Sequence, residues 1–554
     1  MLDRRRFALG LLAVLGLALA ARALPLLWSP YPATLDGFGY VADAQATIAR
    51  GSIPLAGFRA EDFVFTSFTI TASRVLGVDP LVALQALMIP VGGTAVLAGI
   101  ALVSRCCDGI GSRRTARLAA LLAGLLLAVS GIYLRRTLVP DSDILAHAFV
   151  PLLAVAWFRL LRTGRRPWAV VSGVFLVAFP LVHTLSTLLA ALTLTGVTVA
   201  ALVAGVPWRR LSIGAAAVAA FWAYVAGYYW FAGAHPLLTV SYVDRVSAYP
   251  GLFLAWIVVL ILGIAWFGTT SPRLRQAVAA APFAVALLAL AVNGVTTVFP
   301  GTIPTPPGLL PLMSLNLVMV AFAVRVWKRV PARGMVLVVV ALLAAPVVVM
   351  YFALTASLAP EYFATALRAH TFVYLPLIVL AAIGAATIAS NATSSNKEQS
   401  GPQGIARRVS LGRGLVAVLV VSTVGTAPLA YADLDTMSYP GTTTPGEFEA
   451  TGFAAVHSTQ SVATDHALSR VIGHFHAGGA GVAPTRQWLR GGPPPDRPTL
   501  SRTTWAERGA HFFPGAPVAT SRSRYDAAIQ CRHLVYATTT RDALALTLPA
   551  NGSC

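Results

Sequence analysis

The chain has 554 residues, of which 56% are hydrophobic and only 11% are charged, and its formal net charge is +20. A soluble fold of this size could not bury so much apolar surface, and apolar runs of about 20 residues, each long enough to cross a bilayer, recur along most of the chain. The basic residues stand in short clusters between these runs, so we interpret them as topology signals and exclude a nucleic-acid partner.

The apolar runs predict an α-helical polytopic membrane protein with about thirteen transmembrane helices. The expected spans are 7–28, 81–103, 115–134, 144–161, 168–183, 186–205, 211–231, 251–268, 276–298, 308–324, 334–354, 370–390 and 413–431. The first span follows "MLDRRR" and resembles a twin-arginine leader. We expect it to remain as a signal anchor, because a chain with many later spans needs no removable leader.

A long connection at 29–80 follows the first span and carries about fifty residues, far more than a usual connection. Within it, Asp36 and Tyr40 begin a pattern of residues at near-helical spacing that ends at Gly51 and Pro54. This pattern predicts an amphipathic helix at the membrane surface. Such a helix would hold Asp36 at the mouth of the helix bundle.

The next polar segment, "RRTLVPDSDILAH" (135–147), separates two apolar runs. Carboxylates at the edge of a hydrocarbon layer cost desolvation free energy, so Asp141 and Asp143 are candidates for function. Hard ions such as Mg²⁺ or Mn²⁺ prefer carboxylate oxygen, and His147 lies one helical turn beyond Asp143. We predict a metal site formed by Asp141, Asp143 and His147. The alternative is helix capping, which also favours acidic residues after a proline.

Other polar side chains lie at the ends of the expected spans. Arg135 and Arg136 flank the acidic loop and are predicted to bind phosphate, because the guanidinium fork donates two hydrogen bonds to phosphate oxygens. His183 lies in the short turn between two spans. A hydrogen-bonded interface residue is the alternative to a functional histidine at that position.

The composition changes from about 432 onward, where His, Pro, Thr and charged residues increase and the long apolar runs end. Segments such as "HLVYATTT" predict short strands, and segments such as "HALSRVIGHF" predict helices. We therefore divide the chain into a membrane domain, 1–431, and an external C-terminal α/β domain, 432–554. Cys531 and Cys554 lie in the second domain, and both a disulfide and two free thiols are open for them.

The basic clusters alternate from one loop to the next along the chain, so that arginine-rich loops lie at one side of the membrane. By the positive-inside rule, the N-terminus is expected to be cytoplasmic and the C-terminal domain external. The expected location is the cell membrane. Asp36, Asp141 and Asp143 then all fall in external loops, and the acidic groups gather on one face.

Taken together, these features resemble the GT-C glycosyltransferases, multi-pass enzymes that move a sugar from a polyprenyl-phosphate carrier to an external acceptor. Asp36 corresponds to the acidic residue of their first loop, and Asp141-Ser142-Asp143 corresponds to an Asp-x-Asp-like motif in their second external loop. Residues 432–554 correspond to the external domain of the oligosaccharyltransferase catalytic subunits. The resemblance extends over the whole chain in architecture.

The resemblance implies that Asp36 is the catalytic base, since a carboxylate within hydrogen-bond reach can take the proton of the attacking acceptor. Without it, a helix cap or a partner of a nearby arginine would be the interpretation of Asp36. It also implies that Arg368, before the "LPL" of a late span, contacts the carrier phosphate, with His370 beside it. We place Tyr40 and His183 among the residues that contact substrate, and Mg²⁺ or Mn²⁺ as the expected cofactor.

The chain departs from the family pattern at several points. Gly37 follows Asp36 where many of these enzymes have glutamate, and the C-terminal region lacks a Trp-Trp-Asp motif. The stretch "FPGTIPTPPGLLP" holds no acidic residue. These differences favour transfer of a monosaccharide over asparagine glycosylation. The expected partners are a polyprenyl-phosphate-linked sugar, membrane lipid, and a protein or glycan acceptor.

Two other classes of function stay open. A multi-pass transporter or lipid-linked glycan flippase would place charge at mid-membrane and often shows repeated halves. No internal repeat is evident in this sequence, and the acidic residues gather on one face. A non-catalytic assembly or polymer-export protein would not need Asp36, Asp141 and Asp143 to converge. The site geometry should distinguish these classes.

Overall fold

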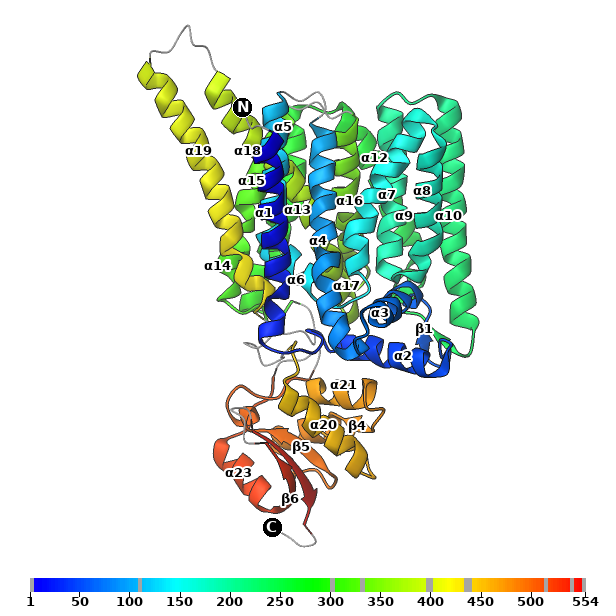
Figure 1. Cartoon of the computed structure of the whole chain (residues 1–554), viewed down its shortest axis with the longest axis vertical. Coiled ribbons are helices and arrows are strands. Elements are labelled where there is room, and N and C mark those ends of the chain that lie inside the picture. The colour runs from blue at the N-terminus through cyan, green and yellow to red at the C-terminus, as the bar shows by residue number, and fades with distance from the viewer. Residues whose placement is uncertain are drawn as a thin grey trace.

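The computed structural model of the chain describes residues 4–107, 112–298, 304–328, 334–394, 402–432, 441–512, 517–538 and 543–550. Apolar helices run side by side through most of its length, and a smaller sheet-containing region lies at one end of them (Figure 1). The helical bundle and the C-terminal sheet match the predicted fold class, which is confirmed.

The bundle consists of apolar helices of 10 to 27 residues. They are α1 (Arg4–Ala23), α4 (Pro80–Cys106), α5 (Arg113–Val129), α7 (Ile144–Thr163), α8 (Arg166–Ala178), α9 (Thr184–Val203), α10 (Trp208–Ala234), α12 (Pro250–Thr269), α13 (Pro272–Val295), α15 (Asn316–Arg325), α16 (Met335–Ala356), α18 (Tyr374–Ser394) and α19 (Pro402–Gly425). Every expected span coincides with one of these helices. Alternating loops therefore lie at opposite ends of the bundle.

Within the described residues, ten helices are long and apolar enough to cross a membrane. An eleventh is the pair α5 and α6 (Gly131–Leu138), which is bent by 67°. The expected count of about thirteen is reached only when the two shorter apolar helices Arg166–Leu181 and Leu309–Arg325 are added. The bend lies where Gly131 packs against a distant segment: a Cβ on Gly131 would lie 1.8 Å from the carbonyl oxygen of Thr426, so only glycine permits this approach.

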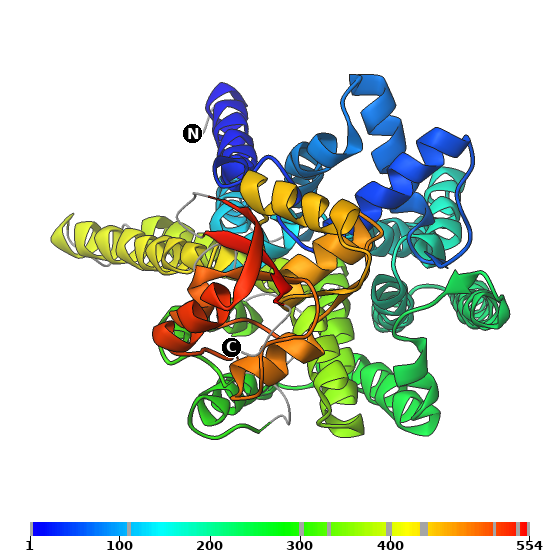
Figure 2. The same ribbon diagram turned by 90° about the horizontal axis from the view of Figure 1, so that it is seen from below.

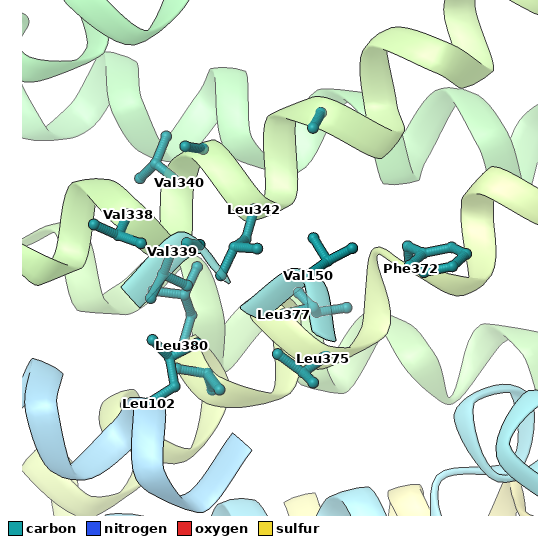
Figure 3. Close-up of a cluster of buried hydrophobic side chains, with 14 of the residues drawn as sticks. Leu102, Val150, Val338, Val339, Val340, Leu342, Phe372, Leu375, Leu377 and Leu380 are labelled. Carbon is teal, nitrogen blue, oxygen red and sulfur yellow. The ribbon is translucent and has the colours of Figure 1, made fainter. Parts of the chain in front are cut away.

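The core of the bundle lies between α4, α5, α7, α9, α16 and α18. Helix α16 is apolar on all sides and buried along most of its length, as expected for a helix at the centre of a bundle. Figure 3 shows Val150 of α7, Leu342 of α16 and Leu375 of α18 grouped in this core. These helices form the rigid support for the loops at their ends.

Shorter elements cover the end of the bundle that faces the sheet. They are α2 (Asp36–Arg50), β1 (Phe58–Arg59), α3 (Phe63–Leu76), β2 (Leu238–Thr239), α11 (Val243–Ser247), α14 (Leu309–Ser314) and α17 (Pro360–Thr371). Helix α2 is the amphipathic helix expected at the start of the first long connection, and it ends at Gly51 with φ 74°. Strand β1 pairs in parallel with β2, which ties the first long connection to the segment after α10.

The C-terminal region is an α/β fold. Its elements are α20 (Pro445–His457), β3 (Val462–Ala463), α21 (His466–His474), β4 (Ala480–Gly481), α22 (Ala483–Leu489), β5 (Thr499–Arg502), α23 (Arg522–Gln530), β6 (Arg532–Ala537) and β7 (Leu544–Pro549). The strand order is β4-β3-β5-β7-β6, with β3 parallel to both neighbours and β7 antiparallel to both of its own. Cys531 is disulfide-bonded, and Cys554 lies outside the described residues.

The C-terminal region packs directly on α2 and the segment before it (Figure 2). The ring of Phe38 lies 6.0 Å from that of Phe448 and 6.1 Å from that of Phe475. The hydroxyl of Ser29 donates to the carbonyl oxygen of Thr443 at 2.6 Å. An apolar contact with added hydrogen bonding therefore fixes one face of α2, while its other face meets the bundle.

Candidate active site

The start of α2 and the PDSD loop, residues 140–143, meet at the end of the bundle. Asp36 is the first residue of α2, and the next residue, Gly37, packs near Pro140 of the PDSD loop. A Cβ on Gly37 would lie 2.5 Å from Pro32 Cβ and 3.3 Å from Pro140 Cγ. The glutamate that many GT-C enzymes carry at this position would not fit. Packing at Gly37, above all against Pro32 of the same segment, therefore leaves no room for a larger side chain.

One guanidinium group holds both aspartates of the PDSD loop. Arg136 Nη2 lies 3.1 Å from Asp141 Oδ2, and it also donates to Asp143 Oδ2. The side chains of Asp141 and Asp143 are 6% and 0% exposed. Two carboxylates at this depth need a charged partner, and the last turn of α6 supplies it.

The two aspartates differ in their electrostatics. Burial alone would raise the pKa of Asp141, but the guanidinium groups of Arg136 and Arg368 outweigh it and hold this pKa well below its usual range. Burial raises the pKa of Asp143 and prevails over the opposing effect of Arg136. Asp141 thus keeps its charge to lower pH than Asp143 does, and it is the one that faces Arg368.

Arg368 joins the two loops from a third segment. Its Nη2 lies 3.9 Å from Asp36 Oδ2, and its Nη1 lies 3.8 Å from Asp141 Oδ2. Both distances are longer than a hydrogen bond, so neither carboxylate saturates the guanidinium. The side chains of Arg368 and Asp36 are 30% and 32% exposed. Arg368 can therefore contact an anion that enters from solvent. Arg136, Arg368, Asp36, Asp141 and Asp143 form a polar cluster, and Asp36 is its accessible carboxylate.

Tyr40 packs behind Asp141 on the next turn of α2. Its hydroxyl lies 3.4 Å from Asp141 Oδ1 and 3.3 Å from the hydroxyl of Ser142. Burial raises the pKa of Tyr40 well above its usual value, so the hydroxyl stays protonated and donates. Tyr40 was expected to contact substrate, but in this structure it is fully buried and supports Asp141.

His183 is buried at the N-terminus of α9, where its Nδ1 accepts a hydrogen bond from the backbone N–H of Ser186. Its ring meets that of Tyr242 edge-on at 5.8 Å. Burial lowers the pKa of His183 to about 3, although Asp141 opposes the shift. The neutral imidazole of His183 therefore lies among the buried side chains near Asp141.

Sequence reasoning missed three residues of the cluster: Asp62, Arg59 and Tyr242. Arg59 Nε lies 2.9 Å from Asp62 Oδ2, and its guanidinium lies over the Tyr40 ring. Burial raises the pKa of Asp62 to about 7, against the effect of Arg59. The adjacent acids of "RAEDF", placed directly before an apolar helix, were the available signal.

Tyr242 lies between two guanidinium groups. Arg245 is 4.3 Å and Arg368 is 5.7 Å from the centre of its ring. Its φ of 65° is rare for a bulky residue, and such backbone conformations concentrate at functional sites. The phenol ring therefore helps to orient Arg368 toward the two carboxylates. No sequence pattern marks this position.

His147 does not join the aspartates, and its prediction as a ligand of their metal is corrected. Its ring stacks on Phe372 at 4.0 Å, in the interior of the bundle. The described residues contain no group of three His, Cys, Asp or Glu side chains that could hold a metal ion. The capping alternative is also incomplete, because Asp143 is the N-cap residue of α7 but makes no side-chain capping bond.

The predicted phosphate-binding residues have separate positions. Arg136 is bonded to both aspartates, so it holds the loop and is not free for phosphate. Arg135 is half-buried on the same turn of α6, and its role stays a prediction. His370 approaches the hydroxyl of Tyr374 at 3.4 Å. It is two residues from Arg368 and therefore faces another side of α17.

A groove with a volume of about 1190 Å³ lies between α9, α10 and α12. Its walls are mainly apolar and include Trp222. Thr184 and Asp244 also line it. Thr184 directly follows His183, and Asp244 lies two residues after Tyr242. Two residues that line the groove are thus close in sequence to His183 and Tyr242.

Replacing Arg136 by methionine should destabilise the protein by about 3 to 5 kcal/mol, because it leaves Asp141 and Asp143 buried without their shared partner. The measurement is the temperature at which detergent-solubilised protein loses its monodisperse gel-filtration peak. Adding Asp143→Asn to Arg136→Met should restore part of the loss. The control is Arg50→Met, at the exposed end of α2. Equal stability of the Arg136 and Arg50 variants would contradict the ion-pair interpretation.

No family model and no curated protein matches the chain. Solved structures do match it. The apo oligosaccharyltransferase of Archaeoglobus fulgidus has 13% sequence identity and a TM-score of 0.52, over 88% of this chain and 66% of that one. The same protein, AglB, in complex with an inhibitory peptide and a dolichol-phosphate has 12% identity and a TM-score of 0.53, over 98% of this chain and 74% of that one.

ArnT from Cupriavidus metallidurans, bound to undecaprenyl phosphate, has 13% identity and a TM-score of 0.44, over 98% of each chain. AglB and ArnT are GT-C glycosyltransferases. The archaeal protein has also been solved in complex with Zn and sulfate. The likeness to AglB shows that this chain has the GT-C fold, which confirms the resemblance found in the sequence.

Proposed function

We propose that the chain is a GT-C-type membrane glycosyltransferase that moves a sugar from a polyprenyl-phosphate carrier to an acceptor at the external face of the membrane. The observation that carries this proposal is the position of Arg368. Its guanidinium lies 3.9 Å from Asp36 and 3.8 Å from Asp141, and neither of them saturates it. A phosphate bound there would lie directly beside a carboxylate able to accept a proton.

Asp36 is the proposed base. As the acceptor hydroxyl attacks the anomeric carbon, an oxygen–carbon bond forms and the hydroxyl proton passes to the Asp36 carboxylate. The bond between the anomeric carbon and the phosphate oxygen breaks, and its electron pair stays on the phosphate. The partial exposure of Asp36 suits contact with an incoming acceptor.

Arg368 is the proposed phosphate-binding residue, because its planar fork can donate two hydrogen bonds to phosphate oxygens as negative charge develops there. Tyr242 and the ionised Asp141 orient this guanidinium. The neighbouring groove between α9, α10 and α12 is the proposed site of the carrier chain, because its apolar walls match a hydrocarbon.

The residues present do not fit the expected Mg²⁺ or Mn²⁺ ion at Asp141, Asp143 and His147, since Arg136 holds both carboxylates and His147 packs elsewhere. We expect sugar transfer to persist when membranes are washed with EDTA, because Arg368 can supply positive charge to the phosphate. The measurement is the transfer rate before and after chelation. Loss of transfer that is restored by Mg²⁺ or Mn²⁺ alone would reinstate a metal site.

The C-terminal region bears on the class of acceptor. The C-terminal region lies over α2 and beside Asp36, so we propose that it helps to bind a protein or glycan acceptor. The arginine-rich loops support a cytoplasmic N-terminus and an external C-terminal region in the cell membrane. This orientation can be tested with single cysteines introduced at Arg50 and at Arg166. An impermeant reagent added outside should label the cysteine at 50 and not the one at 166.

The direct test uses membranes that contain the full chain and a radiolabelled polyprenyl-phosphate sugar. Transfer of label to an endogenous protein or glycan supports the proposal. If no label is transferred from a panel of such donors, while labelled carrier crosses the membrane only when the chain is present, the protein is a transporter or flippase. Neither outcome depends on knowing the acceptor in advance.

A further inference from the structure

A single buried amide connects the two acidic loops. Gln85 lies in α4 and is fully buried. Its Oε1 accepts a hydrogen bond from the backbone N–H of Ala33 at 2.8 Å. Its Nε2 donates to the backbone carbonyl of Leu138 at 2.9 Å. One side chain of the rigid bundle thus bonds two segments that are distant in sequence.

The two bonded backbone groups occupy equivalent places. Ala33 lies three residues before Asp36, and Leu138 lies three residues before Asp141. The loops also contact one another near Gly37, where a side chain would meet Pro32 and Pro140. Gln85 therefore bonds the segment just before Asp36 and the segment just before Asp141.

We infer that Gln85 is a positioning residue that sets the separation of Asp36 from Asp141. This inference rests on the proposed function, because the separation matters only if the two carboxylates serve one reaction. Gln85 itself is too deeply buried to contact substrate. Each segment is short between its bond to Gln85 and its carboxylate, so loss of the bonds displaces the proposed base Asp36 and also Asp141, which orients Arg368.

Gln85→Met keeps the length of the side chain and removes both hydrogen-bonding groups. A displacement of about 1 Å in a reacting group can lower a rate by about 100-fold, so we expect kcat to fall by about 10-fold to 100-fold. The KM for the lipid donor should change less than kcat, by under about 3-fold, because Arg368 is carried by α17 and is also oriented by Tyr242, which belongs to neither loop. A purely structural defect would lower the amount of folded protein and leave kcat per folded molecule unchanged.

Gln85→Glu provides a pH-dependent test. An ionised carboxylate accepts from Ala33 but repels the carbonyl of Leu138, whereas a protonated one can donate to that carbonyl. Burial raises the pKa of a buried glutamate by several units. We therefore expect the activity of Gln85→Glu relative to the original protein to rise about 5-fold or more between about pH 8 and about pH 6. The relative activity of Gln85→Met should stay constant over this range.

The matched control is Gln45→Met. Gln45 also links α2 to α4, since its Nε2 donates to Asp79 at the start of α4, but it bonds neither acidic loop. We expect its kcat to be unchanged. All variants are compared per folded molecule, and binding of polyprenyl phosphate alone is measured in parallel.

The outcomes separate this inference from the proposed function. If the original protein neither transfers sugar nor binds polyprenyl phosphate, the proposed function fails. If the original protein transfers sugar and Gln85→Met transfers it at the same kcat, only the positioning role of Gln85 fails. If the activity of Gln85→Glu relative to the original protein does not change with pH, the hydrogen-bond explanation is overturned, even if Gln85→Met is slow.

Discussion

Replacing Asp36 by asparagine is expected to lower the rate of sugar transfer by about 10²-fold to 10⁴-fold, the usual contribution of a general base. Asparagine preserves the shape and the helical position of the side chain but cannot accept the proton. The side chain is about one-third exposed and lies at the first residue of α2, so the protein should fold normally. The measurement is transfer of label from the lipid-linked sugar at matched expression.

The control for this prediction is Asp79→Asn, the same substitution at an exposed carboxylate that caps α4. Asparagine caps helices as well as aspartate does, so the control should retain its stability and its full transfer rate. Equal rates for the Asp36 and Asp79 variants would show that Asp36 is structural. Transfer would then require another base among the carboxylates of the cluster.

Replacing Arg368 by methionine is expected to lower kcat/KM for the lipid donor by about 10²-fold to 10³-fold, because a preorganised donor to the leaving phosphate is lost. It also leaves Asp36 and Asp141 facing each other without a cation between them. Arg368→Lys should recover part of the activity, since lysine restores the charge but not the two-pronged geometry. The measurement is the dependence of the initial rate on donor concentration.

Arg74→Met is the control for the loss of an arginine, because Arg74 is exposed on α3 at the same end of the bundle. Its kinetics should match those of the original protein. A result in which Arg368→Met retains its kcat/KM would remove the main support for phosphate binding at this site. In that case Arg135 would be the next arginine to test.

Much of the fold could be predicted, because it depends on local patterns. The apolar runs marked every helix of the bundle, and the spacing after Asp36 marked α2 and its end at Gly51. The membrane makes these patterns strong, since a span must satisfy its own backbone hydrogen bonds and remain apolar. The bend between α5 and α6 was not visible, since it depends on contact of Gly131 with a residue far along the chain.

The partners within the site were less predictable. Arg135 and Arg136 are equivalent in the sequence, and only the packing of α6 turns Arg136 toward the aspartates. His147 was paired with Asp143 by helical spacing. However, the carboxylate of Asp143 pairs with Arg136, and the ring of His147 packs on Phe372. Choices of this kind depend on neighbours supplied by distant segments, which periodicity cannot identify.

The contact between α2 and the C-terminal region has a consequence for biogenesis. The bond from Ser29 to Thr443 spans 414 residues, and the rings around Phe38 come from the same late segment. During synthesis, Asp36 is translated long before the surface that packs on its helix. We expect the start of α2, with Asp36, to lack these contacts until the segment that contains Thr443, Phe448 and Phe475 has been made and has folded. A partly made chain would then leave the pool of lipid-linked sugars intact.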